Sequence, residues 1–226
     1  AEDLSVEKSQ SVSISADLYR NWGEWQGNFL VEGFFTDLDD VFALKEIGFE
    51  DGILIKERHN ESGARVFGGN LEGKIAYRNL FQLQLGLTAQ NSKYKEARSW
   101  SDEVEATRNM FRTPDFHGYF TASYNPVKEL TLAMTGTYTG SMLVEHHAGM
   151  IEQNVTVRTP DFWDMGFKAA YNFKLYKSFN LEVNAGVQNI LNSFQNDFDS
   201  GADRDSGYMY GPTLPRTFFL GVKLAY

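Results

Sequence analysis

The segment Thr217-Phe218-Phe219-Leu220-Gly221-Val222-Lys223-Leu224-Ala225-Tyr226 alternates between two kinds of side chain. Every second residue from Phe218 onward is large and apolar, whereas the residues between them include a glycine and a lysine. Successive side chains of a β-strand point to opposite faces of its sheet. This segment therefore predicts a strand with one apolar face.

The same period of two recurs along the chain and predicts an all-β, antiparallel protein. In 181–188, for example, Leu, Val, Ala and Val alternate with Glu, Asn, Gly and Gln. Such alternation over several residues is typical of a sheet with two different faces. The expected strands, about nine in number, cover residues 10–21, 27–46, 64–78, 81–98, 116–125, 129–145, 161–175, 178–190 and 215–226.

Two architectures fit this pattern, a transmembrane β-barrel and a soluble β-sandwich. Segments 29–44 and 130–144 are longer than the usual strand of about 5–6 residues, which favours the barrel. The second face is rich in Gly, Thr, Asn and Gln, and its charged residues would be costly in a soluble core. We expect these charged side chains to point inward: Arg20, Glu32, Glu72, Lys168, Lys174 and Glu182.

The connections alternate between short and long, as in bacterial outer-membrane barrels. The long, polar connections are expected at 48–63, 99–115, 146–159 and 192–213. Single-chain bacterial barrels have an even number of strands. An odd count therefore predicts a fragment, or a chain that closes its barrel with another chain.

Composition excludes several other classes of protein. With 42% apolar and 23% charged residues the chain is not disordered by composition. It has no cysteine, which excludes disulfides and thiolate sites, and its net charge of −9 argues against nucleic acid as a partner. The sequence has no run of about 18 apolar residues, so it predicts no transmembrane helix. The first residues, Ala1 to Leu4, lack the features of a signal peptide.

Four segments resemble the TonB-dependent receptors of bacterial outer membranes. The C-terminal segment 210–226 resembles the last strand of that family, and Gly186-Val187-Gln188-Asn189-Ile190-Leu191-Asn192 resembles its "NLFN" segment. A mid-barrel pattern of the family is matched by Asn60, Gly63, Ala64 and Gly68, with Asn70 at the position where the family usually has Glu and Glu72 two residues later. Another mid-barrel pattern is matched by Leu4, Glu7 and Ser9, with Val6 in place of a Pro. The segments 204–208 and 214–217 look most like receptors of Bacteroides-type bacteria.

This resemblance implies that residues 1–226 are the C-terminal part of a barrel of about 22 strands, with the plug domain and earlier strands outside this chain. It implies TonB-dependent import, across the bacterial outer membrane, of a scarce metal-containing nutrient: haem, a ferric siderophore or cobalamin. The expected partners are the TonB complex through the plug, the remaining barrel or another chain, outer-membrane lipid and a surface lipoprotein. No covalent chemistry is implied, so the protein is not expected to be an enzyme.

Two groups of residues are candidates for ligand binding in the long loops. Asp197, Asp199, Asp203 and Asp205 resemble a calcium loop, because alternating carboxylates around a glycine turn can converge on Ca²⁺. The plainer interpretation is an acidic, solvated loop, since the terminal Glu of an EF-hand is missing.

His146, His147, Tyr208 and Tyr210 are candidates for contact with the substrate. Paired imidazoles can bind a metal chelate. Neighbouring strand residues point to opposite faces, however, so both histidines can serve one site only if the backbone is irregular there. The plainer interpretations are a polar rim for the histidines and an aromatic girdle at the lipid interface for the tyrosines, with Met209, Phe162, Trp163, Trp22 and Trp25.

Three other functions remain open. A glycan or peptide importer of the same family would differ in its substrate. A small self-contained barrel, acting as an adhesin or rim enzyme, would need an even strand count. A soluble β-sandwich would bury residues such as Leu181, Leu220 and Phe167 against a second sheet.

Overall fold

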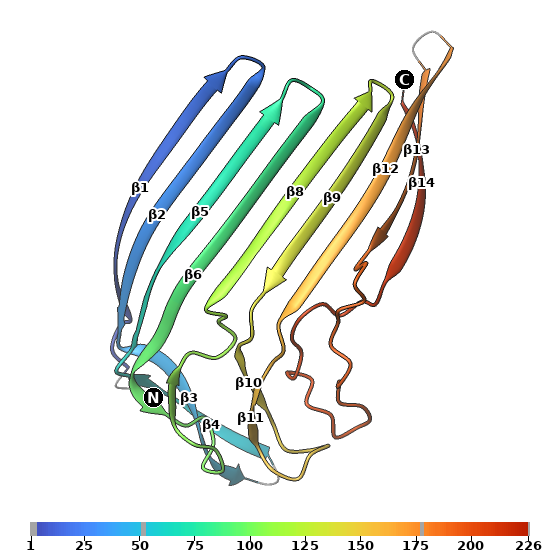
Figure 1. The fold of residues 1–226 in the computed structure, drawn as a ribbon. Helices are drawn as coiled ribbons and strands as arrows, with labels where there is room; N and C mark the ends of the chain where they lie inside the picture. The colour runs from blue at the N-terminus through green and yellow to red at the C-terminus, as the bar shows by residue number, and fades with distance from the viewer. Residues whose placement is uncertain (1–3, 51–52, 177–178, 226) are drawn as a thin grey trace.

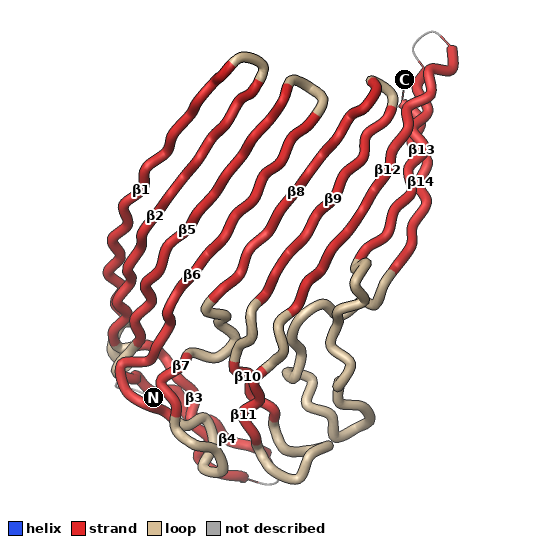
Figure 2. Tube along the Cα trace, viewed as in Figure 1, coloured by secondary structure: helices blue, strands red, loops and turns tan. Residues whose placement is uncertain are grey.

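The computed structural model describes residues 4–50, 53–176 and 179–225, which form one broad, curved antiparallel sheet (Figures 1 and 2). The strand order of its main path is β1-β2-β5-β6-β8-β9-β12-β13-β14, so that each strand pairs with its nearest large neighbour in sequence. Within the described residues β1 and β14 are the two edges of this sheet, which is not closed into a cylinder.

The bounds of the nine large strands are β1 (Lys8–Trp22), β2 (Trp25–Asp39), β5 (Ala64–Tyr77), β6 (Phe81–Arg98), β8 (Phe116–Val127), β9 (Leu130–Thr139), β12 (Phe162–Tyr176), β13 (Phe179–Gln188) and β14 (Thr217–Ala225). The long loops contain two small hairpins, β3 (Val41–Glu50) with β4 (Ile53–Glu61) and β10 (Leu143–His146) with β11 (Val155–Arg158), and the short strand β7 (Thr107–Asn109). Among the described residues no helix is long and apolar enough to cross a membrane.

Within the described residues, which leave out positions 178 and 226 of the expected strands, the predicted strands are confirmed except at two places, where one expected strand is two. The segment 27–46 breaks after β2 because Asp40 adopts a positive φ of 56°, and β3 then pairs with β4 instead of continuing the sheet. The segment 129–145 breaks at Gly140. Its amide donates to the carbonyl of Phe116 at 2.9 Å, and a Cβ there would lie 2.6 Å from that carbonyl oxygen. The expected loops 48–63 and 146–159 are therefore partly hairpins.

The apolar face of the sheet is uncovered. Phe218 and Leu220 are each 76% exposed and Ile14 is 79% exposed, while Phe167 and Leu181 also keep part of their surface exposed. Figures 1 and 2 show one layer of strands across these faces. The β-sandwich alternative is wrong, because the described residues place no second sheet over Phe167, Leu181 and Leu220.

The opposite, concave face carries the polar side chains. On it the amide of Asn70 donates to Glu32 at 2.8 Å, and the hydroxyl of Thr88 donates to Asn70 at 2.8 Å. One of the charged side chains predicted to point inward is wrongly placed. Strict alternation in β1 puts Arg20, which is in register with Gly27, on the same face as Leu18 and Ile14.

The two rims differ as predicted. Tight turns join β1 to β2, β5 to β6 and β8 to β9 at one rim, and the long loops and small hairpins lie at the other (Figure 1). Aromatic side chains lie at both rims: Trp25 packs on Tyr77 at 4.8 Å between ring centroids, and Trp163 packs on Tyr138 at 4.9 Å. The girdle prediction is wrong for three residues that are buried, namely Phe162 at the start of β12 and Tyr208 and Tyr210 in the last long loop.

Candidate functional site

The last long loop, residues 189–216, is folded back over the end of the sheet rather than left extended (Figure 1). Its two ends are held by asparagines of the segment that resembles "NLFN". The side chain of Asn189 is buried and donates to the carbonyls of Leu214 at 2.8 Å and Ser193 at 3.1 Å. Asn192 accepts from the backbone N–H of Arg216 at 2.9 Å. Both asparagines have positive φ, 49° and 55°, which this residue tolerates better than most.

A small core fixes the middle of this loop against β10 and β12. It consists of the buried residues Val144, Phe162, Tyr208 and Tyr210. Gln195 is 1% exposed and bridges the two tyrosines, because its Nε2 donates to the carbonyl of Tyr208 at 3.2 Å and its Oε1 accepts from the N–H of Tyr210 at 2.7 Å. Gln195 was not singled out from the sequence, where one more polar loop residue carries no signal of burial.

Three of the four predicted calcium ligands accept hydrogen bonds that fasten the loop. Asp197 accepts from the hydroxyl of Tyr208 at 2.9 Å and from that of Tyr210 at 2.7 Å. Asp199 accepts from the N–H of Asp205 at 2.9 Å, and Asp205 accepts from the N–H of His147 at 2.9 Å.

The fourth predicted calcium ligand, Asp203, is exposed. The described residues contain no group of three or more His, Asp or Glu side chains arranged to hold a metal ion. The calcium site stays a prediction, and the geometry gives Asp197, Asp199 and Asp205 another role as hydrogen-bond acceptors.

The hydrogen bonds also shift the acidity of these loop groups. Burial alone raises the pKa of Asp197, but the bonds from Tyr210, Tyr208 and Gln195 outweigh it and hold that pKa below its ordinary value. Burial likewise opposes the backbone N–H groups of His147 and Gly207 at Asp205, and the pKa of Asp205 is again lowered. Burial and the bond to Asp197 raise the pKa of Tyr210. Asp197 therefore stays a carboxylate and Tyr210 a neutral donor near neutral pH.

The two candidate histidines face different surroundings. His146, at the end of β10, is 7% exposed; its ring stacks on Tyr208 at 3.6 Å and its Nε2 lies 3.0 Å from Asp199. His147 is only partly buried, and its ring meets Trp100 edge-on at 4.7 Å. The structure thus groups His146, Tyr208 and Tyr210 in the loop core, where they shape the loop, and leaves His147 on a more open surface.

That more open surface borders a groove between the β3–β4 hairpin and the ends of β6 and β10. Two adjoining cavities of about 340 Å³ each share Leu44, Glu61, Ser99 and Trp100; Phe42, Lys56, Arg98, Glu145 and His147 line one of them, and His59, Ser101 and Asp102 line the other. We call these two cavities together the hairpin groove. Each has the volume of a small-molecule site. Sequence reasoning missed Trp100, although a tryptophan in a polar loop is itself a signal of a contact surface.

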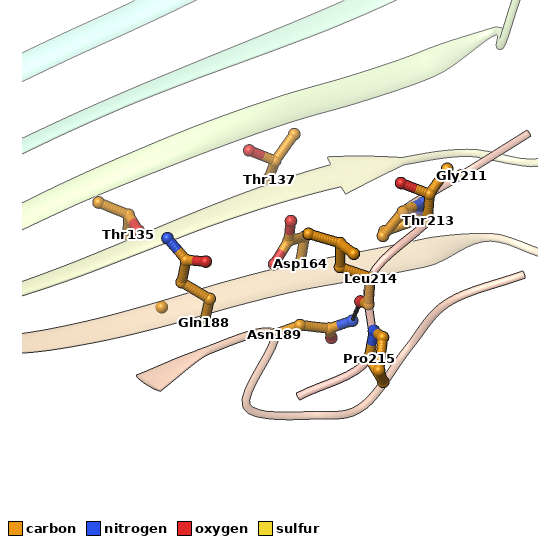
Figure 3. Close-up of a pocket in the computed structure, with 11 residues that line it drawn as sticks. Thr135, Thr137, Asp164, Gln188, Asn189, Gly211, Thr213, Leu214 and Pro215 are labelled. Atoms are coloured by element: carbon orange, nitrogen blue, oxygen red, sulfur yellow. Dashed lines mark hydrogen bonds between the residues drawn. The ribbon is translucent and has the colours of Figure 1, made fainter. Parts of the chain in front are cut away.

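A third cavity, of about 480 Å³, lies on the concave face under the last part of the loop (Figure 3). Thr135 and Thr137 of β9, Asp164 of β12 and Gln188 of β13 point toward it, and segment 211–215 forms its outer wall. Its lining is rich in hydroxyl, amide and carboxylate groups, which suit hydrogen bonding to a polar ligand or to another polar segment of protein.

Comparison with known proteins identifies relatives of the fold. The family model described as "TonB dependent receptor-like, beta-barrel" matches residues 1–190. Comparison with curated proteins gives no match.

Three solved structures are similar to this chain. The ferric-catecholate import receptor Fiu from E. coli K12 has a TM-score of 0.64 at 19% identity, over 96% of this chain and 27% of Fiu. The FrpB iron transporter from Neisseria meningitidis has 0.58 at 17%, over 98% and 32%. The copper transporter OprC has 0.56 at 15%, over 98% and 32%. At such identities the likeness is one of fold, and this chain spans about a third or less of each structure.

Proposed function

This chain belongs to the family of TonB-dependent receptor-like β-barrels, and from that premise we propose that it is part of an outer-membrane receptor that imports a scarce metal-containing nutrient. The observation that carries the proposal is the two-faced sheet. Its convex face exposes apolar side chains such as Phe218, Leu220 and Ile14, and its concave face carries amides and the ion pair of Lys168 with Glu182. A sheet of this kind suits lipid on one side and a polar lumen on the other.

The remainder of the receptor supplies what these residues lack. Because β1 and β14 are unpaired edges among the described strands, further strands of the receptor complete the cylinder. This chain forms the C-terminal part of that barrel. A plug inside the lumen contacts the concave face, and TonB acts on the plug to release the ligand inward. The lipid partner is the outer membrane.

The long-loop rim faces the ligand. The hairpin groove and His147 lie at this rim, and the folded loop 189–216 lies at the same rim. The names of the similar structures support a metal-containing nutrient, since they are described as transporters of iron, copper or a ferric catecholate.

Growth on defined metal sources tests the proposal. A strain that carries the receptor, a receptor deletion and a TonB deletion should be compared on haem, cobalamin or a ferric siderophore as the scarce nutrient. We expect the receptor deletion and the TonB deletion to abolish growth on the same source. Growth that depends on the receptor but not on TonB contradicts coupled import, and a defect confined to a glycan or peptide source contradicts the metal-containing nutrient.

A further inference from the structure

The net negative charge of this chain lies in its long loops. Segments 40–63, 99–115, 140–161 and 189–216 contain 17 of the 30 Asp and Glu residues but only 8 of the 21 Lys and Arg residues, which accounts for the whole net charge of −9. The other segments hold 13 of each sign and are neutral overall. Because the four segments meet at one rim of the sheet (Figure 1), that rim carries a negative field.

The hairpin groove opens at this rim and has fixed walls. Arg98 donates to Glu61 at 2.6 Å and to the hydroxyl of Tyr94 at 2.7 Å, and it lies 3.8 Å from the centre of the Tyr94 ring. The indole N–H of Trp100 donates to Thr156 at 3.0 Å, so that the ring is held in place. A held aromatic ring binds a flat apolar surface at little further cost in conformational entropy.

The charge inside the groove follows that of the rim. Alternation in β10 turns Val144 and His146 into the loop core and leaves Glu145 to line the groove. The ion pair with Arg98 balances the charge of Glu61. Of the remaining described residues in the lining, Glu145 and Asp102 are carboxylates, and Lys56 is the one Lys or Arg residue.

We propose that the hairpin groove is the first docking site of the imported ligand, and that this ligand carries no net negative charge and presents a flat aromatic or apolar part to Trp100 and Leu44. The proposal rests on the import function proposed above and names its substrate class. A polyanionic chelate would be repelled during approach by the acidic rim and inside the groove by Glu145 and Asp102. A neutral complex meets no such barrier, and a cationic one is attracted.

This inference separates the chain from one of its structural relatives. Fiu is described as a ferric-catecholate receptor, and a ferric catecholate is a multiply charged anion. The shared fold therefore does not carry the same ligand chemistry, because ligand choice depends on loop residues grafted on the barrel.

Binding to the purified intact receptor tests the charge preference directly. The probes are cyanocobalamin, which is neutral, ferrioxamine B, which is cationic, and ferric enterobactin, which is a trianion. We expect one of the first two to bind at least roughly tenfold more tightly than ferric enterobactin in calorimetry at low salt. Glu145→Lys should weaken binding of ferrioxamine B roughly fivefold. Glu129→Lys makes the same charge change in the turn between β8 and β9 at the other rim, and should have no effect.

Three results overturn the inference: equal or tighter binding of ferric enterobactin, no binding of any of the three probes, or an equal response to Glu145→Lys and Glu129→Lys. The growth test of TonB dependence is independent of this result. A receptor that supports TonB-dependent growth but prefers the trianion keeps the proposed function and refutes the substrate class. A receptor without TonB-dependent growth refutes the function itself.

Discussion

Replacing Gln195 with Leu should release the loop 189–216 from the end of the sheet. The side chains are similar in size, so the change removes the hydrogen bonds of Gln195 to Tyr208, Tyr210 and Asp197 with little change in packing volume. It leaves the N–H of Tyr210 and the carbonyl of Tyr208 buried without their partner. Each unsatisfied buried group costs about 1–3 kcal/mol.

The docked loop should therefore lose about 2–6 kcal/mol, which corresponds to a roughly 30- to 20,000-fold rise in the population of its open state. Hydrogen exchange of residues 189–216 in the intact receptor measures this rise as a loss of protection. Gln153→Leu is the matched control, because Gln153 is exposed in the β10–β11 loop. Unchanged protection in Gln195→Leu, or an equal loss in Gln153→Leu, would refute the reasoning.

Three other perturbations test separate parts of the account. Leu220→Arg places a charge on the lipid face and should lower the free energy of unfolding of the barrel by about 2–4 kcal/mol if the residue lies near the bilayer midplane. Urea unfolding in lipid vesicles measures this free energy. A change below about 0.5 kcal/mol, the size typical of surface substitutions, would count against lipid contact. Gly68→Ala should destabilise by about 1–3 kcal/mol, because its Cβ would lie 2.3 Å from the carbonyl oxygen of Ala89, whereas Gly33→Ala, whose nearest neighbour is at 3.9 Å, should be tolerated in the same assay. Because the pKa values of Asp197 and Asp205 are lowered in the folded protein, their carboxylates stabilise the docked loop at pH values above the ordinary carboxyl pKa, and this stability is lost as pH falls through the folded-state pKa values. We expect the hydrogen-exchange protection of the loop to be constant down to a pH of about 4 and to fall below it. A loss of protection centred near neutral pH would contradict this expectation.

The strands could be predicted from sequence because alternation is a local property. In β13 and β14 the polarity of each side chain indicates the face of the sheet on which it lies, and the register of the two strands keeps side chains of the same kind on the same face. The two errors in strand bounds have a different origin. Asp40 and Gly140 end strands through backbone geometry, a positive φ in one case and close contact with another strand in the other.

The loop core could not be predicted in the same way. The sequence marks His146, Tyr208 and Tyr210 as candidates for contact with the substrate, but their burial depends on contacts between segments about 50 residues or more apart, as in the bond from His146 to Asp199. Trp100 owes its position to the same long-range docking, whereas Gln195 bonds to Tyr208 and Tyr210 within the folded loop. The sequence marks chemically capable residues in these loops, and only the packed structure separates those that shape the loop from those that line the groove.

The lipid contact of the convex face is the central claim, and site-directed spin labelling across residues 218–224 tests it most directly. Residues 1–226 contain no cysteine, so that this part of the receptor adds no background to single labels placed at successive positions of this strand in bilayers. Labels at 218, 220, 222 and 224 should collide with oxygen dissolved in lipid, and labels at 219, 221 and 223 should respond instead to a water-soluble nickel chelate or be shielded by protein. An accessibility pattern without this period of two, or with the even positions shielded from lipid, would contradict the account.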